Sequence, residues 1–165
     1  TLTAKLEFGD QKANVLNVLP PMRAGDIARS FGMANANGRW CQVDFLTYES
    51  SAIANIHIIG DAIQIAPGMP KSGHMANQHA KVCAAAVVEL LTKGQVNPTP
   101  MVANTCYSFI DDKNVVHVAS VHEYDAKDRT MKVVAGSGGL SAAGNELEGV
   151  YANAWANTIW ADMLA

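Results

Sequence analysis

The segment Asn97-Pro98-Thr99-Pro100 most constrains what this chain can fold into. Each proline lacks a backbone N–H, so neither a helix nor a central β-strand continues through the pair. The chain has 165 residues, enough for one ordinary domain or two small ones. Strand and helix patterns alternate before the prolines, and short strands with polar turns follow them. The sequence therefore predicts a boundary between residues 1–95 and 96–165.

The first part opens with a predicted hairpin. Residues 2–8 alternate apolar and polar side chains, Gly9-Asp10 supplies a turn, and residues 13–19 form a mainly apolar run that ends at Pro20-Pro21. Periodic signals are weak from 22 to 52, where only residues 41–46 suggest a short strand. We therefore expect a hairpin that ends in a rigid loop.

The strongest helix signal lies between residues 72 and 94. Ser72 is a suitable N-cap, and Gly94 is a suitable residue to follow the helix. Just before it, residues 55–59 (Asn-Ile-His-Ile-Ile) predict a short buried strand that ends at Gly60-Asp61. The apolar positions that fall at helical spacing are Ala76, Ala80, Cys83, Val87 and Leu91.

The second part predicts an antiparallel meander closed by a helix. Residues 107–110, 115–122 and 131–134 have strand character and are separated by turn-like segments rich in aspartate. We expect a terminal amphipathic helix whose apolar arc contains Leu147, Val150, Tyr151, Ala154, Trp155 and Thr158. The expected fold class is α/β, followed by a small α+β part with an antiparallel sheet and a terminal helix.

Composition argues against several classes of function. The 12 basic and 15 acidic residues give a formal charge of -3, without the basic field of a nucleic-acid binding protein. No apolar run approaches the ~20 residues that span a bilayer. Among the five histidines, His74 and His79 miss the i, i+4 spacing of metal ligands on a helix, and no Gly-x-Ser-x-Gly hydrolase motif occurs. We therefore expect a soluble protein with no nucleic acid, no membrane span and no metal.

The segment from Gly60 to Gly73 can be interpreted as a flavin or nucleotide site. Asp61 follows the predicted strand, and the positive end of the predicted long helix points back across the carboxyl edge of that strand. Asp61 could accept a hydrogen bond from a cofactor hydroxyl, while free amides near Ser72 could stabilise negative charge on a ring or phosphate. Gly-Asp is also a common turn after a strand, so this pattern leaves both interpretations open.

A set of motifs in a fixed order along the whole chain favours the flavin interpretation. They include Asn-Ile-His-Ile-Ile-Gly-Asp at 55–61, Met-Pro-Lys-Ser-Gly at 69–73, Asn-Thr-Cys-Tyr-Ser at 104–108 and the tail around Trp155. The first two look like the second FAD motif of flavoproteins with two dinucleotide-binding domains. The complete set most resembles the flavoprotein subunit of flavocytochrome c sulfide dehydrogenase.

This resemblance implies an FAD-dependent oxidoreductase that oxidises sulfide and passes electrons to a c-type cytochrome subunit in the periplasm. Residues 1–95 would be the C-terminal part of the FAD-binding domain, with the end of the nucleotide-like domain at 1–12. Residues 96–165 would be a domain at the flavin and cytochrome interface. The family's Gly-x-Gly-x-x-Gly motif is absent from this chain. We therefore expect a C-terminal portion that lacks the N-terminal FAD half, binds FAD weakly or not at all, and is inactive alone.

The resemblance also implies roles for single residues. It places Cys106 in a redox disulfide beside the flavin, with the partner cysteine in the N-terminal half, whereas Cys41 and Cys83 lie in segments typical of a core. Lys71 could favour the reduced anionic flavin, and Trp155 matches a tryptophan near the ring. On pattern alone, Lys71 could equally be a solvated cation and Trp155 a core residue. The cofactor-binding candidates are Gly60, Asp61, Pro70, Lys71, Ser72 and Trp155.

Two other functions remain open at this point. Residues 98–165 could form a docking or dimerisation surface of a non-catalytic module, with the Gly-Asp segment as ordinary fold. The parent could also be a related sulfide:quinone or NADH-type flavoprotein. A membrane-associated quinone enzyme would favour a basic amphipathic helix at the C-terminus, and the last predicted helix has no basic residue.

Overall fold

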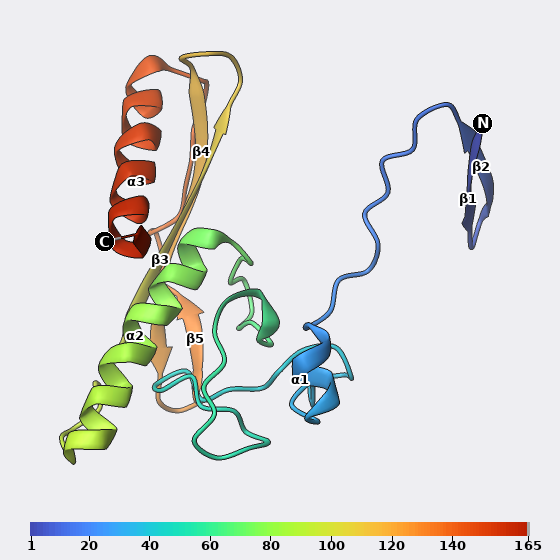
Figure 1. Ribbon diagram of the computed structural model, residues 1–165. Coiled ribbons are helices and arrows are strands. Elements are labelled where there is room, and N and C mark those ends of the chain that lie inside the picture. The colour runs from blue at the N-terminus through green and yellow to red at the C-terminus, as the bar shows by residue number, and fades with distance from the viewer. Residues whose placement is uncertain (165) are drawn as a thin grey trace.

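The computed structural model describes residues 1–164. Figure 1 shows a sheet that carries two long helices, a middle segment of loops, and an N-terminal hairpin that stands apart from the rest. No helix within residues 1–164 has the length and apolar character needed to cross a membrane. The elements in chain order are β1 (Leu2–Leu6), β2 (Gly9–Ala13), α1 (Asp26–Ser30), the 3-10 helix η1 (Gly60–Ala62), α2 (Gly73–Thr92), β3 (Met101–Phe109), β4 (Val115–Asp125), β5 (Thr130–Val133), β6 (Gly139–Leu140) and α3 (Glu146–Leu164).

The N-terminal hairpin is confirmed, but its second strand is not the predicted one. β1 pairs with β2 antiparallel from Leu2↔Ala13 to Leu6↔Gly9, so the turn falls on Glu7-Phe8. Gly9 adopts φ +113, a conformation that glycine tolerates and other residues avoid. The predicted strand at 13–19 is wrong, because Val15 and Leu19 are exposed and have no neighbouring strand in the described chain.

The loops from residue 31 to 72 replace the buried strand predicted at 55–59. His57 forms a single antiparallel bridge with Glu49, and both Ile56 and Ile59 are exposed. Residues 41–46 likewise contribute only isolated bridges. β-Branched residues favour a strand only where a neighbouring strand completes the hydrogen-bond ladder. No such neighbour lies beside this segment within residues 1–164, so the strand prediction is wrong.

Helix α2 matches the predicted helix closely at both ends. The Ser72 hydroxyl oxygen accepts a hydrogen bond from the N–H of Met75 at 3.0 Å, which fixes the first turn. At the other end Lys93, rather than Gly94, takes the left-handed conformation, and the N–H of Gly94 donates to the carbonyl of Glu89. The buried face is shifted from the predicted stripe, since its fully buried members are Met75, His79 and Ala86.

The predicted antiparallel meander is confirmed. The strand order is β3-β4-β5, with β6 also paired to β4. β3 begins at Met101 rather than 107, because its pairing with β4 extends from Phe109↔Val115 to Met101↔Glu123. The short strand β6 pairs with Val118 and Ala119 of β4 and is absent from the sequence prediction.

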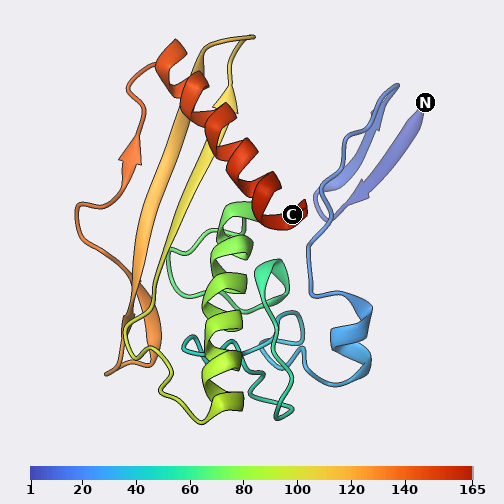
Figure 2. The ribbon, with the colours of Figure 1, turned by 60° about the vertical axis from the view of Figure 1, so that its left-hand side comes forward.

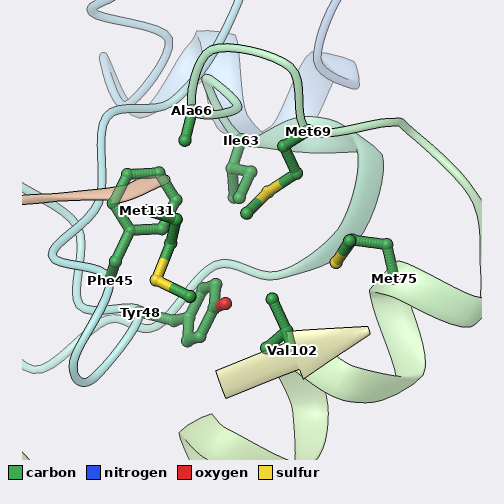
Figure 3. Close-up of a cluster of buried hydrophobic side chains, with 8 residues drawn as sticks. All are labelled: Phe45, Tyr48, Ile63, Ala66, Met69, Met75, Val102 and Met131. Atoms are coloured by element: carbon green, nitrogen blue, oxygen red, sulfur yellow. The ribbon is translucent and has the colours of Figure 1, made fainter. Parts of the chain in front are cut away.

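One hydrophobic cluster joins the loops, α2 and the sheet (Figure 3). Met75 comes from α2, Val102 from β3 and Met131 from β5, while the other members come from the loops that precede α2. All of them are buried. The cluster therefore contains residues from both sides of the proline segment at 97–100. Its members are Phe45, Tyr48, Ile63, Ala66, Met69, Met75, Val102 and Met131.

Helix α3 forms as predicted, but of its predicted apolar arc Leu147, Val150, Tyr151, Ala154 and Thr158 are exposed, while Trp155 is half-buried. Figures 1 and 2 show α2 and α3 on the same side of the sheet, with the start of α2 near the end of α3. The residues that α3 buries are Gly149 and Ala152, whereas Leu147, Val150 and Tyr151 are 59%, 62% and 52% exposed. Small residues allow the helix to approach the turn between β3 and β4 closely, so the larger side chains remain outside.

Gly149→Ala is expected to destabilise the protein by about 1–3 kcal/mol, although alanine ordinarily favours a helix interior. The added methyl group would overlap the carbonyl oxygen of Lys113, so α3 would have to move away from the β3–β4 turn. The matched control is Gly25→Ala, since no atom of residues 1–164 outside the adjacent chain lies within 4 Å of a Cβ added at Gly25. Urea unfolding measures both variants, and equal stability would contradict the close contact at Gly149.

Candidate functional site

The candidate site is built around the N-terminal end of α2, where the chain at 70–74 meets β3 and α3. Ser72 caps the helix and contacts β3 through Asn104. His74 contacts both β3, through the backbone of Thr105, and α3, through Trp155. The structure thus brings the predicted cofactor segment close to the predicted redox cysteine.

A chain of hydrogen bonds links the helix cap to Cys106. The Ser72 hydroxyl donates to Asn104 Oδ1 at 2.5 Å, and Asn104 Nδ2 donates to Cys106 Sγ at 3.3 Å. Asn104 is only 3% exposed, and it lies two residues before Cys106 on β3, so both side chains project to the same face of the strand. Sequence reasoning missed this role of Asn104, because the predicted strand began at residue 107.

The three cysteines are free thiols in very different surroundings. Cys41 is fully buried and Cys83 is half-buried, and burial raises the pKa of both thiols above its ordinary value. Cys83 also packs against the main hydrophobic cluster, as expected for a core position. Cys106 is half-buried and is the thiol that receives a side-chain amide hydrogen bond. The surroundings therefore distinguish Cys106 from the other two.

Trp155 packs against the aromatic rings of His74 and Tyr107. Its ring centroid lies 5.5 Å from that of His74 and 6.1 Å from that of Tyr107. Burial lowers the pKa of His74, and the His74 Nδ1 atom accepts a hydrogen bond from the N–H of Thr105 at 2.9 Å. The indole Nε1 of Trp155 is buried and has no acceptor within residues 1–164. Trp155 therefore carries a donor that a bound ligand could satisfy.

Lys71 connects the start of α2 to the preceding turn at residues 60–63 through hydrogen bonds. Its ammonium donates to the backbone carbonyls of Asp61 and Ile63 at 2.6 and 2.8 Å, and it lies 3.7 Å from the ring centroid of Trp40. Burial lowers the pKa of Lys71, an effect that the negative charge of Asp61 opposes. Lys71 was predicted either as a solvated cation or as a neighbour of the flavin, and in the structure it has defined protein partners. One of them, Trp40, was not connected to Lys71 by sequence reasoning.

Gly60 packs directly against the first turns of α2. It is buried with φ +69, its N–H donates to His79 Nδ1 at 3.3 Å, and a Cβ added there would lie 3.2 Å from that of Ala76. Asp61 follows with its side chain exposed, and Pro70 is half-buried next to Lys71. The left-handed turn at Gly60 therefore allows Asp61 to leave the core and reach the surface beside the helix end.

The residues present fit one side of a flavin site. The N–H groups of Gly73 and His74 have no acceptor inside their own helix and lie at its positive end. A hollow of about 180 Å³ is lined by Asp61, Lys71 and Trp40, among others, but not by Gly73 or His74. A complete cofactor pocket is larger, about 300–1,000 Å³. These residues thus offer amide donors, a cation and an aromatic surface, but enclose only part of a cofactor.

Two further observations concern a second hollow and the side chains that could bind a metal ion. A separate hollow of about 510 Å³ is lined by Asp44, Glu49 and Arg129 among others and contains none of the predicted site residues. Within residues 1–164 no group of three or more His, Cys, Asp or Glu side chains has the arrangement of a metal site.

The antiparallel sheet of β3, β4 and β5 and the terminal helix α3 lie within one stretch of the chain that can be compared with known families. Residues 98–164 match the family model described as flavocytochrome c sulphide dehydrogenase, flavin-binding. The resemblance to that flavoprotein subunit is thereby confirmed for residues 98–164, which contain Asn104, Cys106 and Trp155. The match supports a flavin-dependent oxidoreductase as the parent protein.

Proposed function

We propose that this chain is the C-terminal part of an FAD-dependent sulfide dehydrogenase, which oxidises sulfide through a disulfide that includes Cys106 and passes electrons to a c-type cytochrome. The observation that carries the proposal is the family match over residues 98–164, the stretch that holds Cys106 in its hydrogen-bonded position. The division into a partial FAD-binding domain at 1–95 and an interface domain at 96–165 belongs to the same proposal.

The residues around the start of α2 would hold the cofactor. FAD, when bound, supplies an acceptor for two electrons. The exposed carboxylate of Asp61 could accept a hydrogen bond from a cofactor hydroxyl, and the first-turn amides after Ser72 would stabilise negative charge on the cofactor. Trp155 would donate its indole N–H to the cofactor. Gly60, Pro70 and Lys71 would hold the backbone around Asp61 in position beside the start of α2.

The chemistry assigned to Cys106 is thiol–disulfide exchange. Hydrosulfide attacks one sulfur of the disulfide between Cys106 and a cysteine outside this chain, and a new S–S bond forms to the substrate sulfur. The original S–S bond breaks, and the other cysteine leaves as a thiolate with the electron pair of that bond. The substrate sulfur is oxidised and the disulfide is reduced by the same two electrons. A second hydrosulfide then takes the bound sulfur as HS–S⁻, which frees the attacked cysteine as a thiolate, and transfer of the two electrons from the resulting dithiol to the flavin would restore the disulfide.

The test uses the complete flavoprotein, including the sequence that precedes Thr1. Anaerobic addition of sulfide is expected to bleach the visible flavin absorbance, and added oxidised cytochrome c is then reduced with recovery of the flavin spectrum. Location in the periplasm follows from the same family resemblance and is tested by cell fractionation. A flavin that stays oxidised in excess sulfide would contradict the proposed activity.

The exposed apolar face of α3 favours one alternative, a protein-binding module without catalysis. Leu147, Val150 and Tyr151 offer a surface suited to a protein contact. The same experiment separates the two functions. A module of this kind would bind the cytochrome in a pull-down, yet its flavin spectrum would not respond to sulfide.

A further inference from the structure

Asn104 is a buried amide whose two ends are used differently. Its Oδ1 accepts from the Ser72 hydroxyl, and its Nδ2 donates to Cys106 Sγ. Burying an amide is costly unless its polar atoms find partners, and an apolar residue would fill the same space without that cost. The cap at Met75 does not need Asn104, because the Ser72 oxygen alone accepts the helix N–H. The remaining partner of the amide is the sulfur of Cys106.

The direction of this hydrogen-bond chain suits a sulfur without a proton. The Ser72 oxygen accepts the N–H of Met75 and has one hydrogen, which it donates to Asn104 Oδ1. The Asn104 amide is thereby turned with its NH₂ group toward Cys106. A protonated thiol could also donate to an oxygen, but a thiolate can only accept. The observed orientation therefore makes the Cys106 sulfur an acceptor at the end of this hydrogen-bond chain.

We propose that Asn104, oriented by the Ser72 hydroxyl, is a positioning residue that holds the sulfur of Cys106 and stabilises its thiolate. This inference deepens the proposed function and rests on it, because it assigns the residue that prepares Cys106 for disulfide chemistry. Ser72 then has two tasks: its oxygen caps α2 and its hydrogen sets the polarity of the Asn104 amide. The start of the helix and the reactivity of the cysteine are coupled through one hydroxyl group.

The test measures the alkylation rate of Cys106 by iodoacetamide in the reduced 165-residue chain at neutral pH, with Cys83 of the same molecule as internal reference. Peptide mapping separates the two sites. Asn104→Leu removes the donor and is expected to slow Cys106 about tenfold or more relative to Cys83, since a hydrogen bond to a charged group contributes at least that factor.

Two variants at Ser72 separate helix capping from the orientation of the amide. Ser72→Asp still accepts the N–H of Met75 but cannot donate, so the Asn104 NH₂ group is expected to turn toward the new carboxylate and leave Oδ1 facing the sulfur. The alkylation rate of Cys106 should then fall about tenfold although the helix cap is kept. Ser72→Thr keeps both hydrogen bonds and is expected to rescue the rate.

Circular dichroism and thermal unfolding show whether each variant folds. If Asn104→Leu fails to fold, the Ser72 pair decides alone. Unchanged Cys106 alkylation in folded Ser72→Asp overturns the proposal. The assay needs neither flavin nor sulfide, so its outcome is independent of the proposed function. A parent protein inactive toward sulfide, with the alkylation pattern as expected, would reject sulfide oxidation while retaining the role of Asn104.

Discussion

We expect Cys106→Ser, made in the complete flavoprotein of the proposed function, to lower sulfide-dependent cytochrome reduction by about a thousandfold or more while FAD stays bound. A serine hydroxyl cannot form a disulfide, so no sulfur is available for hydrosulfide to attack or to leave as a thiolate. FAD is retained because the residues proposed to hold it, from Gly60 to Ser72 and Trp155, are unchanged. Stopped-flow spectra of the flavin and the cytochrome measure the activity, and the flavin-to-protein absorbance ratio measures the retained cofactor.

The matched control is Cys83→Ser. Cys83 is half-buried on α2 and packs against the hydrophobic cluster, so its loss affects stability rather than electron transfer. We expect this variant to bleach its flavin with sulfide at close to the wild-type rate. If Cys106→Ser keeps full activity while Cys83→Ser loses it, the assignment of the redox cysteine is wrong.

Acidification from pH 7 to 4 is expected to lower the free energy of unfolding by about 3 kcal/mol through His79 alone. Burial, aided by the positive charge of Lys71 and by His122, lowers the pKa of this imidazole to about 4. In the unfolded chain the pKa returns to roughly 6.5. Between these two pKa values the unfolded state binds a proton that the folded state does not. The contribution of His79 to the free energy of unfolding is therefore complete above pH 6.5 and is lost as the pH falls toward 4. Urea unfolding at several pH values checks the slope.

The control for this prediction is His79→Asn. The asparagine oxygen can replace His79 Nδ1 as acceptor for the N–H of Gly60, but the side chain does not titrate. The variant also loses the packing of His79 on Tyr48, whose ring centroid lies 4.7 Å away, so it is less stable at every pH. Its pH slope should nevertheless be much flatter than that of the wild type. An equally steep slope would show that other groups cause the acid sensitivity.

Sequence patterns predicted elements well where the signal is local. The limits of α2 follow from the Ser72 cap and the end of a helical pattern near Gly94, and the structure agrees within one residue or two at each end. The meander strands and the terminal helix were found for the same reason. Propensity, caps and turns act over a few residues, so a single sequence displays them.

Predictions that depend on distant partners were less accurate. The core face of α2 contains Met75 and His79 because Tyr48 and other loop residues pack there, and no periodicity within the helix displays those partners. The apolar arc of α3 was assigned inward, but Gly149 and Ala152 decide the contact through close approach to Lys113. Residues 55–59 have the composition of a strand, yet the described chain provides no strand to pair with them.

The candidate site shows the same contrast. Motif comparison identified Ser72 and Cys106 separately, because each lies in a short recognisable run. Their connection passes through Asn104, 32 residues beyond Ser72, and depends on how β3 packs beside α2. The partners of Lys71 were hidden for a similar reason, since Trp40 is distant in the sequence. The sequence therefore identified candidate residues such as Ser72 and Cys106, whereas their hydrogen-bond partners could be found only from the tertiary structure.

The hydrophobic cluster that joins the loops to the sheet has a consequence for protein engineering. Val102 and Met131 pack against Tyr48, Ile63 and Met75, so a polypeptide cut at the prolines would present both side chains to water. We expect such a half-molecule to aggregate rather than to fold on its own, because its apolar side chains are exposed. A chimeric protein that contains the sheet with Cys106 should therefore also contain α2 and the loops that precede it. For the same reason, the proline segment is a better place to insert a reporter or protease site than to end an expressed gene.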